Sequence, residues 1–136
     1  MEDFTNFICF QLGASARKIQ NYYNNLFKPY GITLGQSFIL MALLQREGLN
    51  IGGLAEKLML DNSALTGLVD RLEKEDLVQR RVDPEDRRAY LIYMTDKGRE
   101  LAHTVYALVD QFNQQLRGML GEEQQEGIKL LLKSLS

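Results

Sequence analysis

Arginine residues are concentrated in one short stretch of the chain, and their chemistry is that of phosphate recognition. Residues 79–99 hold six of the sixteen basic residues, namely Arg80, Arg81, Arg87, Arg88, Lys97 and Arg99. A planar guanidinium carries a fork of N–H donors that matches phosphate oxygens, so the cluster indicates contact with nucleic acid. A hairpin whose charges face only water is the alternative interpretation of the same cluster.

The charge of the whole chain does not favour a nucleic-acid binder, because its net value is −2 at pH 7 and such proteins usually present a basic footprint. The distribution of charge matters more than the total. Residues 54–78 hold six acidic residues against three basic ones. Attraction to phosphate must therefore come mostly from residues 79–99, and we expect affinity to fall steeply with salt.

Other chemistries have little support in the residues of this chain. One cysteine, Cys9, cannot form an internal disulfide, and Cys9 with the single histidine, His103, cannot build the usual zinc site. Neither a glycine-rich phosphate loop nor a Ser/His/acid arrangement is present, so we expect no enzyme, no cofactor and no metal. The longest apolar run, residues 38–44, is far too short to span a bilayer, and the N-terminus lacks the pattern of a secretory signal. We therefore expect one cytoplasmic domain of 136 residues.

Two helices of unequal length precede the arginine-rich segment. Apolar spacing predicts a short helix over residues 53–59 and a longer one over 63–76, with Asp61 or Asn62 as the cap of the second. The inward stripe of the second helix comprises Leu65, Leu68, Val69 and Leu72, and its opposite face is polar. This pattern is typical of a helix-turn-helix, whose second helix is long enough to lie in a major groove.

The elements around this pair predict a winged helix. Two segments rich in β-branched and aromatic residues, 77–82 and 89–94, flank the turn-forming residues 83–86, which predicts a hairpin. Thr95 caps a long helix that runs to about residue 118, where Gly118 and Gly121 break it. The remaining helices are expected at 4–28, at 34–46 behind a capping box formed by Thr33 and Gln36, and at 122–135. The predicted fold class is mainly α with a small β-hairpin wing.

The first helix and the last two exceed what a winged helix needs for its own core. The apolar faces that remain must be buried against another surface, and a second copy of the chain is the simplest partner. We therefore expect a single domain over residues 1–136, in which residues 33–99 form the DNA-binding lobe. Residues 1–30 and 100–136 form dimerisation helices.

The sequence Leu-Thr-Gly-Leu-Val-Asp-Arg-Leu-Glu-Lys at 65–74, together with Arg-Arg-Val-Asp-Pro-Glu-Asp-Arg-Arg at 80–88 and Thr-Asp-Lys-Gly-Arg at 95–99, resembles the MarR family of bacterial winged-helix regulators. The resemblance extends over essentially the whole chain. It implies a homodimer that binds a pseudo-palindromic duplex DNA operator. It also implies a repressor that a small-molecule effector releases, so we predict a sequence-specific transcriptional regulator.

The resemblance also implies roles for particular residues. The start of the second helix should face base edges, with Arg71 near phosphates or bases. Arg88 should enter the minor groove while Asp86 accepts its guanidinium, and Arg80, Arg81 and Arg87 should neutralise phosphates; a turn ion pair is the alternative for Asp86 and Arg88. The residues expected at base edges are Asn62, Ser63, Thr66 and Gly67.

Two positions depart from the usual pattern of the family. Gly67 stands where a longer side chain commonly reaches DNA, so base readout there is expected to be weaker, and glycine also lowers helix propensity. Asp76 replaces a glycine at a left-handed turn, a conformation that Asp tolerates better than most residues.

Control by a thiol is one alternative, because Cys9 resembles in position the reactive cysteine of the family's hydroperoxide sensors and Tyr23 matches one tyrosine that holds the thiolate. Gly13 and Leu34 replace two further tyrosines, so the donor set is incomplete. The other interpretation makes Cys9 a small buried hydrophobe. The resemblance also implies a phenolic or other aromatic effector that binds in a cleft. Six aromatic residues could line this cleft, and the alternative is that they only pack in the core: Phe7, Phe10, Tyr22, Tyr23, Tyr30 and Phe38.

A winged helix that binds only another protein is the remaining alternative, motivated by the acidic net charge and by Gly67. The wing separates the two interpretations. A protein-binding module has no reason to keep four arginines together with Asp86, which is placed to aim one of them.

Overall fold

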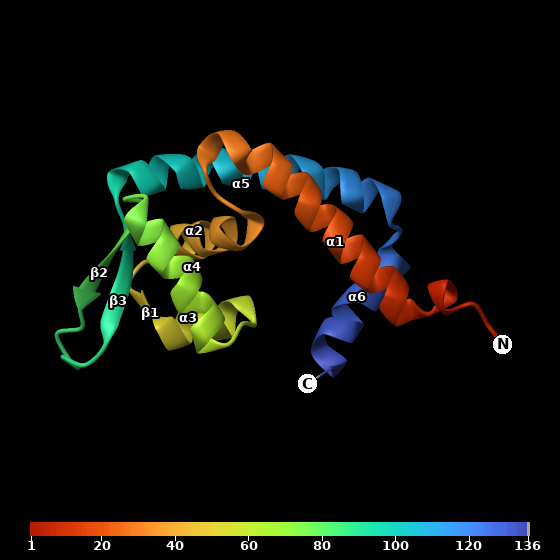
Figure 1. Ribbon diagram of the computed structural model, residues 1–136, viewed down its shortest axis with the longest axis horizontal. Coiled ribbons are helices and arrows are strands. Elements are labelled where there is room, and N and C mark those ends of the chain that lie inside the picture. The colour runs from red at the N-terminus through yellow and green to blue at the C-terminus, as the bar shows by residue number, and fades with distance from the viewer. Residues whose placement is uncertain (136) are drawn as a thin grey trace. The chain divides into compact units, whose positions relative to one another are not determined.

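The computed structural model describes residues 1–135 and confirms a mainly helical fold with a small antiparallel sheet. Its contacts divide the chain into two compact units, of which the first is Met1–Val105 and the second begins at Tyr106. Residue 136, the last of the segment 100–136 expected to dimerise, lies outside the described residues. Figure 1 shows the elements, which are α1 (Ile8–Phe27), α2 (Leu34–Gln45), β1 (Leu49–Asn50), α3 (Ile51–Leu58), α4 (Asn62–Lys74), β2 (Val78–Val82), β3 (Tyr90–Met94), α5 (Asp96–Met119) and α6 (Glu122–Ser134).

The core of the first unit is built around α2, as the nearly all-apolar sequence of this helix predicts. Its start is fixed by the expected capping box, in which the Thr33 N–H donates to the Gln36 side chain at 2.8 Å and the Gln36 N–H donates to the Thr33 hydroxyl at 3.4 Å. Phe38 is the exception on this helix, since 43% of it is exposed. Around α2 lie fully buried side chains from the other elements, including Phe27, Leu54, Leu65, Leu72 and Ile92.

The sheet has one more strand than the sequence predicts. The hairpin of β2 and β3 is confirmed, with Arg80 opposite Ile92. A third strand, β1, pairs antiparallel with β3 and places Leu49 opposite Ile92. Two residues are too few to show strand alternation, so only the tertiary pairing reveals β1. The strand order is β1-β3-β2, which leaves β2 at the edge of the sheet (Figure 1).

One predicted helix boundary is wrong. The expected helix over 4–28 is interrupted at Phe7, which is extended, so that a 3₁₀ turn (Phe4–Asn6) precedes α1. The Asp3 carboxylate caps the short turn by accepting from the Thr5 N–H at 2.9 Å. The predicted end of α5 at about residue 118 is confirmed, since the helix runs to Met119. Of the helices within residues 1–135, none has the length and apolar character that crossing a membrane requires.

A tight junction joins α4, β2 and α5. Asp76 adopts the left-handed conformation (φ 59°), as expected, and the following Leu77 N–H donates to the Leu72 carbonyl at 2.9 Å. Thr95 caps α5, and its hydroxyl accepts from the Gly98 N–H at 3.0 Å and donates to the Asp76 carbonyl at 2.6 Å. A Cβ on Gly98 would lie 1.9 Å from the Leu77 carbonyl oxygen, so only glycine allows this approach.

Gly98→Ala should therefore lower the free energy of unfolding by about 1–3 kcal/mol, because the backbone of Leu77 must move to admit the methyl group. Gly67→Ala is the matched control within a helix. A Cβ at Gly67 meets nothing within 4 Å, so alanine should raise the free energy of unfolding by about 0.5–1 kcal/mol. Urea denaturation measures both values. Equal stability of Gly98→Ala and the unsubstituted protein would disprove the close contact.

Candidate nucleic-acid interface

The exposed helix of the candidate interface is α4, which starts where α3 ends in a tight turn. Met59 closes α3 in the left-handed conformation (φ 57°), and the Leu60 N–H donates back to the Ala55 carbonyl at 2.9 Å. Of the two caps left open by the sequence, Asp61 is the one used, because its carboxylate accepts from the Ala64 N–H at 2.7 Å. The two helices therefore form a helix-turn-helix with α4 as its second helix.

The predicted base-reading residues lie at the exposed start of α4. Asn62, Ser63 and Gly67 are exposed, and Thr66 is half-buried. The Thr66 hydroxyl donates to the Asn62 carbonyl at 2.7 Å, so its oxygen is left to accept a hydrogen bond from a partner. Arg71 is exposed one turn beyond Gly67. The buried side of the helix is formed by Leu65, Val69 and Leu72, while Leu68 is only partly buried.

The tip of the wing is a hydrogen-bonded turn that presents Arg88. The Asp86 carboxylate accepts from the Arg88 backbone N–H at 3.1 Å and lies 3.5 Å from its Nε. The Arg88 side chain is 94% exposed, so the aspartate holds the base of the side chain while its guanidinium projects into solvent. Asp83 supports the same turn, accepting from the Glu85 N–H at 2.9 Å. Arg87 is also exposed at the tip.

Arg81 is held against an aromatic ring. Its guanidinium carbon lies 4.1 Å from the centre of the Tyr93 ring, a cation–π contact between neighbouring strands. Arg81 remains exposed, and its contact with the ring orients the guanidinium. Sequence reasoning missed Tyr93. The contact could have been predicted from the register of the hairpin, because Tyr93 pairs with Gln79, and Arg81, two residues further on, is then its diagonal neighbour.

Arg80 forms an ion pair with α4 within the chain. Its Nη1 donates to the Glu73 carboxylate at 2.6 Å, its Nη2 donates to the Asp70 carboxylate, and its side chain is only 21% exposed. The hydrogen bond to Asp70, with the nearby charge of Glu73, raises the pKa of Arg80 above its ordinary value. The guanidinium is held in an internal ion pair because β2 runs beside the acidic flank of α4. Neutralisation of a phosphate by Arg80 stays a prediction.

Cys9 and Tyr23 are not brought together within one chain. Both lie on α1, and a separation of 14 residues corresponds to about 21 Å along a helix axis. Cys9 is exposed in the single chain. Tyr23 is buried, and burial together with the neighbouring Tyr22 raises the pKa of its hydroxyl. Contact between the two residues therefore requires a second copy of the chain.

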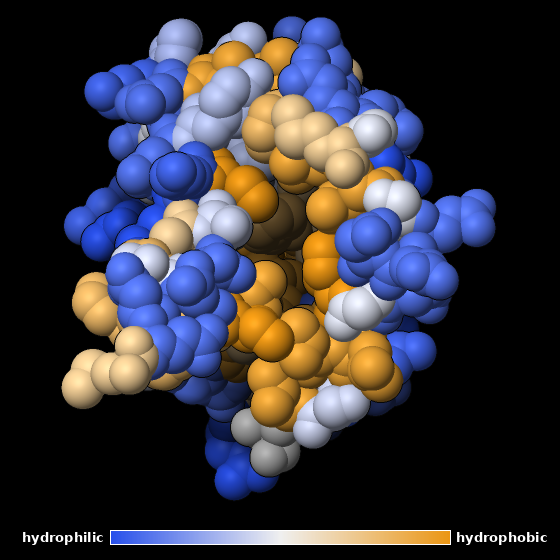
Figure 2. Space-filling model, turned by 90° about the vertical axis from the view of Figure 1, so that its right-hand side faces the viewer, coloured by the Kyte–Doolittle hydropathy of each residue, from blue (hydrophilic) through white to orange (hydrophobic). Residues whose placement is uncertain are grey.

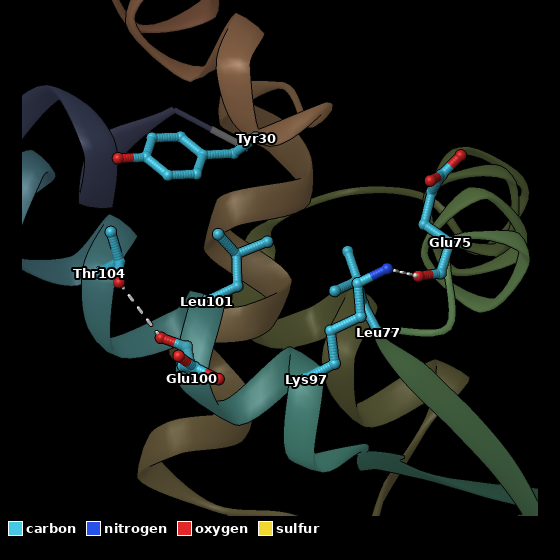
Figure 3. Close-up of a pocket in the computed structure, with 7 residues that line it drawn as sticks. All are labelled: Tyr30, Glu75, Leu77, Lys97, Glu100, Leu101 and Thr104. Carbon is cyan, nitrogen blue, oxygen red and sulfur yellow. Dashed lines mark hydrogen bonds between the residues drawn. The ribbon is translucent and has the colours of Figure 1, made fainter.

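One cavity in the first unit has the size of a small-molecule site. It measures about 320 Å³ and is lined by Tyr30, Glu75, Leu77, Lys97, Glu100, Leu101 and Thr104. Figure 3 shows Leu101 between the Tyr30 ring and Lys97, whose Nζ donates to the Glu75 carbonyl at 3.0 Å. Of the six aromatic residues expected to line a cleft, this cavity contains only Tyr30. The polar lining comes from the end of α4 and the start of α5, which no local sequence signal places together.

The described geometry defines a winged helix-turn-helix protein, with an exposed second helix and an arginine-tipped ribbon beside it. The model of the MarR family matches residues 32–90. The HTH-type transcriptional regulator SarZ of Staphylococcus haemolyticus strain JCSC1435 is 32% identical over 107 residues, which cover 79% of this chain and 73% of that protein. The chain belongs to the MarR family. Matches to SarZ proteins of other staphylococci span 64% to 66% of their length.

Two solved structures extend the similarity to the whole fold. MepR of S. aureus, in a DNA-binding conformation, is 25% identical with a TM-score of 0.79, covering 94% of this chain and 95% of that one. The transcriptional regulator PcaV of Streptomyces coelicolor, in complex with its natural ligand, is 25% identical with a TM-score of 0.78. That match covers 98% of this chain and 94% of PcaV.

Asp61→Ala should lower the free energy of unfolding by about 1 kcal/mol, because the N–H of Ala64 loses its acceptor at the start of α4. Asp61→Asn is the control, since the asparagine side-chain oxygen caps equally well. Chemical denaturation measures both. If Asn destabilises as much as Ala, the carboxylate acts through its charge and not as a cap.

Proposed function

We propose that this protein is a sequence-specific transcriptional regulator, a repressor, that binds a pseudo-palindromic duplex as a homodimer. Helix α4 enters the major groove through Asn62, Ser63, Thr66 and Gly67, and the wing places Arg88 in the adjacent minor groove. Thirteen residues at about 1.5 Å each make α4 roughly 20 Å long, enough to follow the groove. The observation that carries the proposal is the geometry of Arg88, almost fully exposed and held at its base by Asp86.

The charges along the interface support different roles for the wing and for α4. Arg81, Arg87 and Arg88 are exposed on the wing and supply the attraction to phosphate. Arg71 adds a cation on α4, beyond the segment that faces the bases. The absence of a side chain at Gly67 lets the helix backbone approach the groove closely, while direct readout of bases falls to Asn62 and Ser63.

Exposed apolar side chains support the dimer. In the first unit, the start of the chain leaves Phe4, Phe7, Ile8 and Leu12 between 44% and 68% exposed. In the second unit, α6 leaves four residues between 37% and 65% exposed, namely Ile128, Leu130, Leu131 and Leu132. Figure 2 shows apolar residues exposed at the molecular surface. Surfaces of this kind mark association, and residues 1–30 and 100–136 are the proposed dimerisation segments.

The proposed effector is a small aromatic or phenolic molecule, and the cavity at Tyr30 is its proposed site. Glu75 and Leu77 line this cavity on either side of the left-handed turn at Asp76, which connects α4 to the wing. A ligand there acts on DNA affinity only if it binds the DNA-competent and incompetent states differently.

Selection of bound duplexes from a random pool with the purified protein tests the proposal. We expect an enriched palindrome whose half-sites lie about one helical turn apart. Arg88→Ala should weaken binding to that duplex by about tenfold or more, because one minor-groove contact is lost. Glu85→Ala is the control at the same wing tip, where removal of a carboxylate should leave affinity equal or slightly higher. Unchanged binding by Arg88→Ala would overturn the wing mechanism.

The second candidate mode of control is oxidation of Cys9, which its exposure favours. A thiolate at Cys9 would attack an organic hydroperoxide, giving a sulfenic acid and the corresponding alcohol. If a ligand and not Cys9 controls DNA binding, the complex of the protein with the enriched duplex should remain intact after addition of cumene hydroperoxide. Release from the unsubstituted protein that is absent in Cys9→Ser would instead establish the thiol as the sensor.

A further inference from the structure

We propose that Arg80 is a positioning residue, which ties wing strand β2 to helix α4 and so sets the angle between the two DNA-contacting elements. It is not a phosphate ligand. This inference rests on the proposed DNA-binding function.

Both ends of Arg80 are anchored. Its backbone lies in the middle of β2, paired with the fully buried Ile92 of β3. Its two terminal nitrogens donate to carboxylates on successive turns of α4, Asp70 and Glu73. A planar guanidinium that uses both nitrogens is fixed in orientation as well as in position. A swing of the wing away from α4 must therefore break two charge-assisted hydrogen bonds together.

The place of the clamp on α4 connects it to recognition. Asp70 lies four residues after Thr66, so its carboxylate is one helical turn from the proposed base-reading segment on the same face. Without Arg80, this carboxylate and that of Glu73 would stand uncompensated beside the phosphates. The clamp thus holds the wing and also neutralises acidic charge on the flank of α4.

Arg81 offers a contrast one residue along the strand. Side chains alternate in direction along a strand, and Arg81 is exposed over the Tyr93 ring while Arg80 is mostly covered by α4. The two arginines carry the same charge on the same strand. A comparison of variants at these two positions therefore distinguishes a positioning role from a phosphate contact.

The experiment compares Arg80→Ala, Arg80→Lys and Arg81→Ala in binding to the duplex enriched by the unsubstituted protein and to a scrambled duplex of equal composition. Affinity is measured over a series of salt concentrations. Each phosphate contact contributes about 0.9 to the slope of log affinity against log salt. A positioning residue contributes to specific affinity without contributing to this slope.

We expect Arg80→Ala to weaken the enriched duplex by about tenfold and the scrambled duplex by clearly less, because the unpaired carboxylates repel both duplexes. The salt slope, which follows the number of phosphate contacts, should stay unchanged. Arg80→Lys should also weaken the enriched duplex, because one ammonium does not reproduce the planar fork. Arg81→Ala should weaken both duplexes and reduce the slope by about one. A slope that falls by about one in Arg80→Ala, or a wild-type affinity in Arg80→Lys, would overturn the proposal.

A second measurement needs no DNA. Amide hydrogen exchange should accelerate in β2 and β3 of Arg80→Ala and stay unchanged in α2, because the wing loses its tie to α4. Unchanged exchange in the hairpin overturns the clamp. If the unsubstituted protein enriches no duplex, the proposed function fails, and the exchange data alone then decide whether Arg80 couples the wing to the helix.

Discussion

The close approach of the Leu77 carbonyl to Gly98 is the constraint on which the other elements depend. At this point helix α4 ends, the wing begins and α5 starts, within a junction that also contains the left-handed Asp76 and the cap Thr95. Because a Cβ at residue 98 has no space, the start of α5 packs directly on the backbone that leads into β2. The position of the wing is therefore set from its base by backbone contacts, before any side chain of the hairpin contributes.

The candidate interface has an acidic part and a basic part. The segment that contains α4 is acidic, with six carboxylates against three basic residues in 54–78, whereas the exposed wing carries Arg81, Arg87 and Arg88. Two of those carboxylates, Asp70 and Glu73, bind Arg80. In the proposed complex with DNA, the tip of the wing therefore supplies the attraction to phosphate, and Arg80 in its stem reduces the repulsion from α4.

Much of the interface could be predicted from the sequence, because its signals are local. The capping box at Thr33, the cap at Asp61 and the turn at Asp76 each depend on residues within a few positions of one another. The Arg88–Asp86 contact is local in the same sense. The partner of Arg80 was not predictable in this way, because ten residues and a change from helix to strand separate it from Asp70.

The sequence by itself determined the order of elements, the helix-turn-helix, the wing and the family, because periodicity, caps and turn residues act over short stretches of chain. Only the tertiary structure decided the third strand β1, the pairing of Arg80 with α4, the stacking of Arg81 on Tyr93 and the exposure of Cys9. The physical reason is that a charge or a ring finds its partner across space. The sequence around an arginine does not show whether the fold will bring a distant carboxylate of the same chain close enough to pair with it.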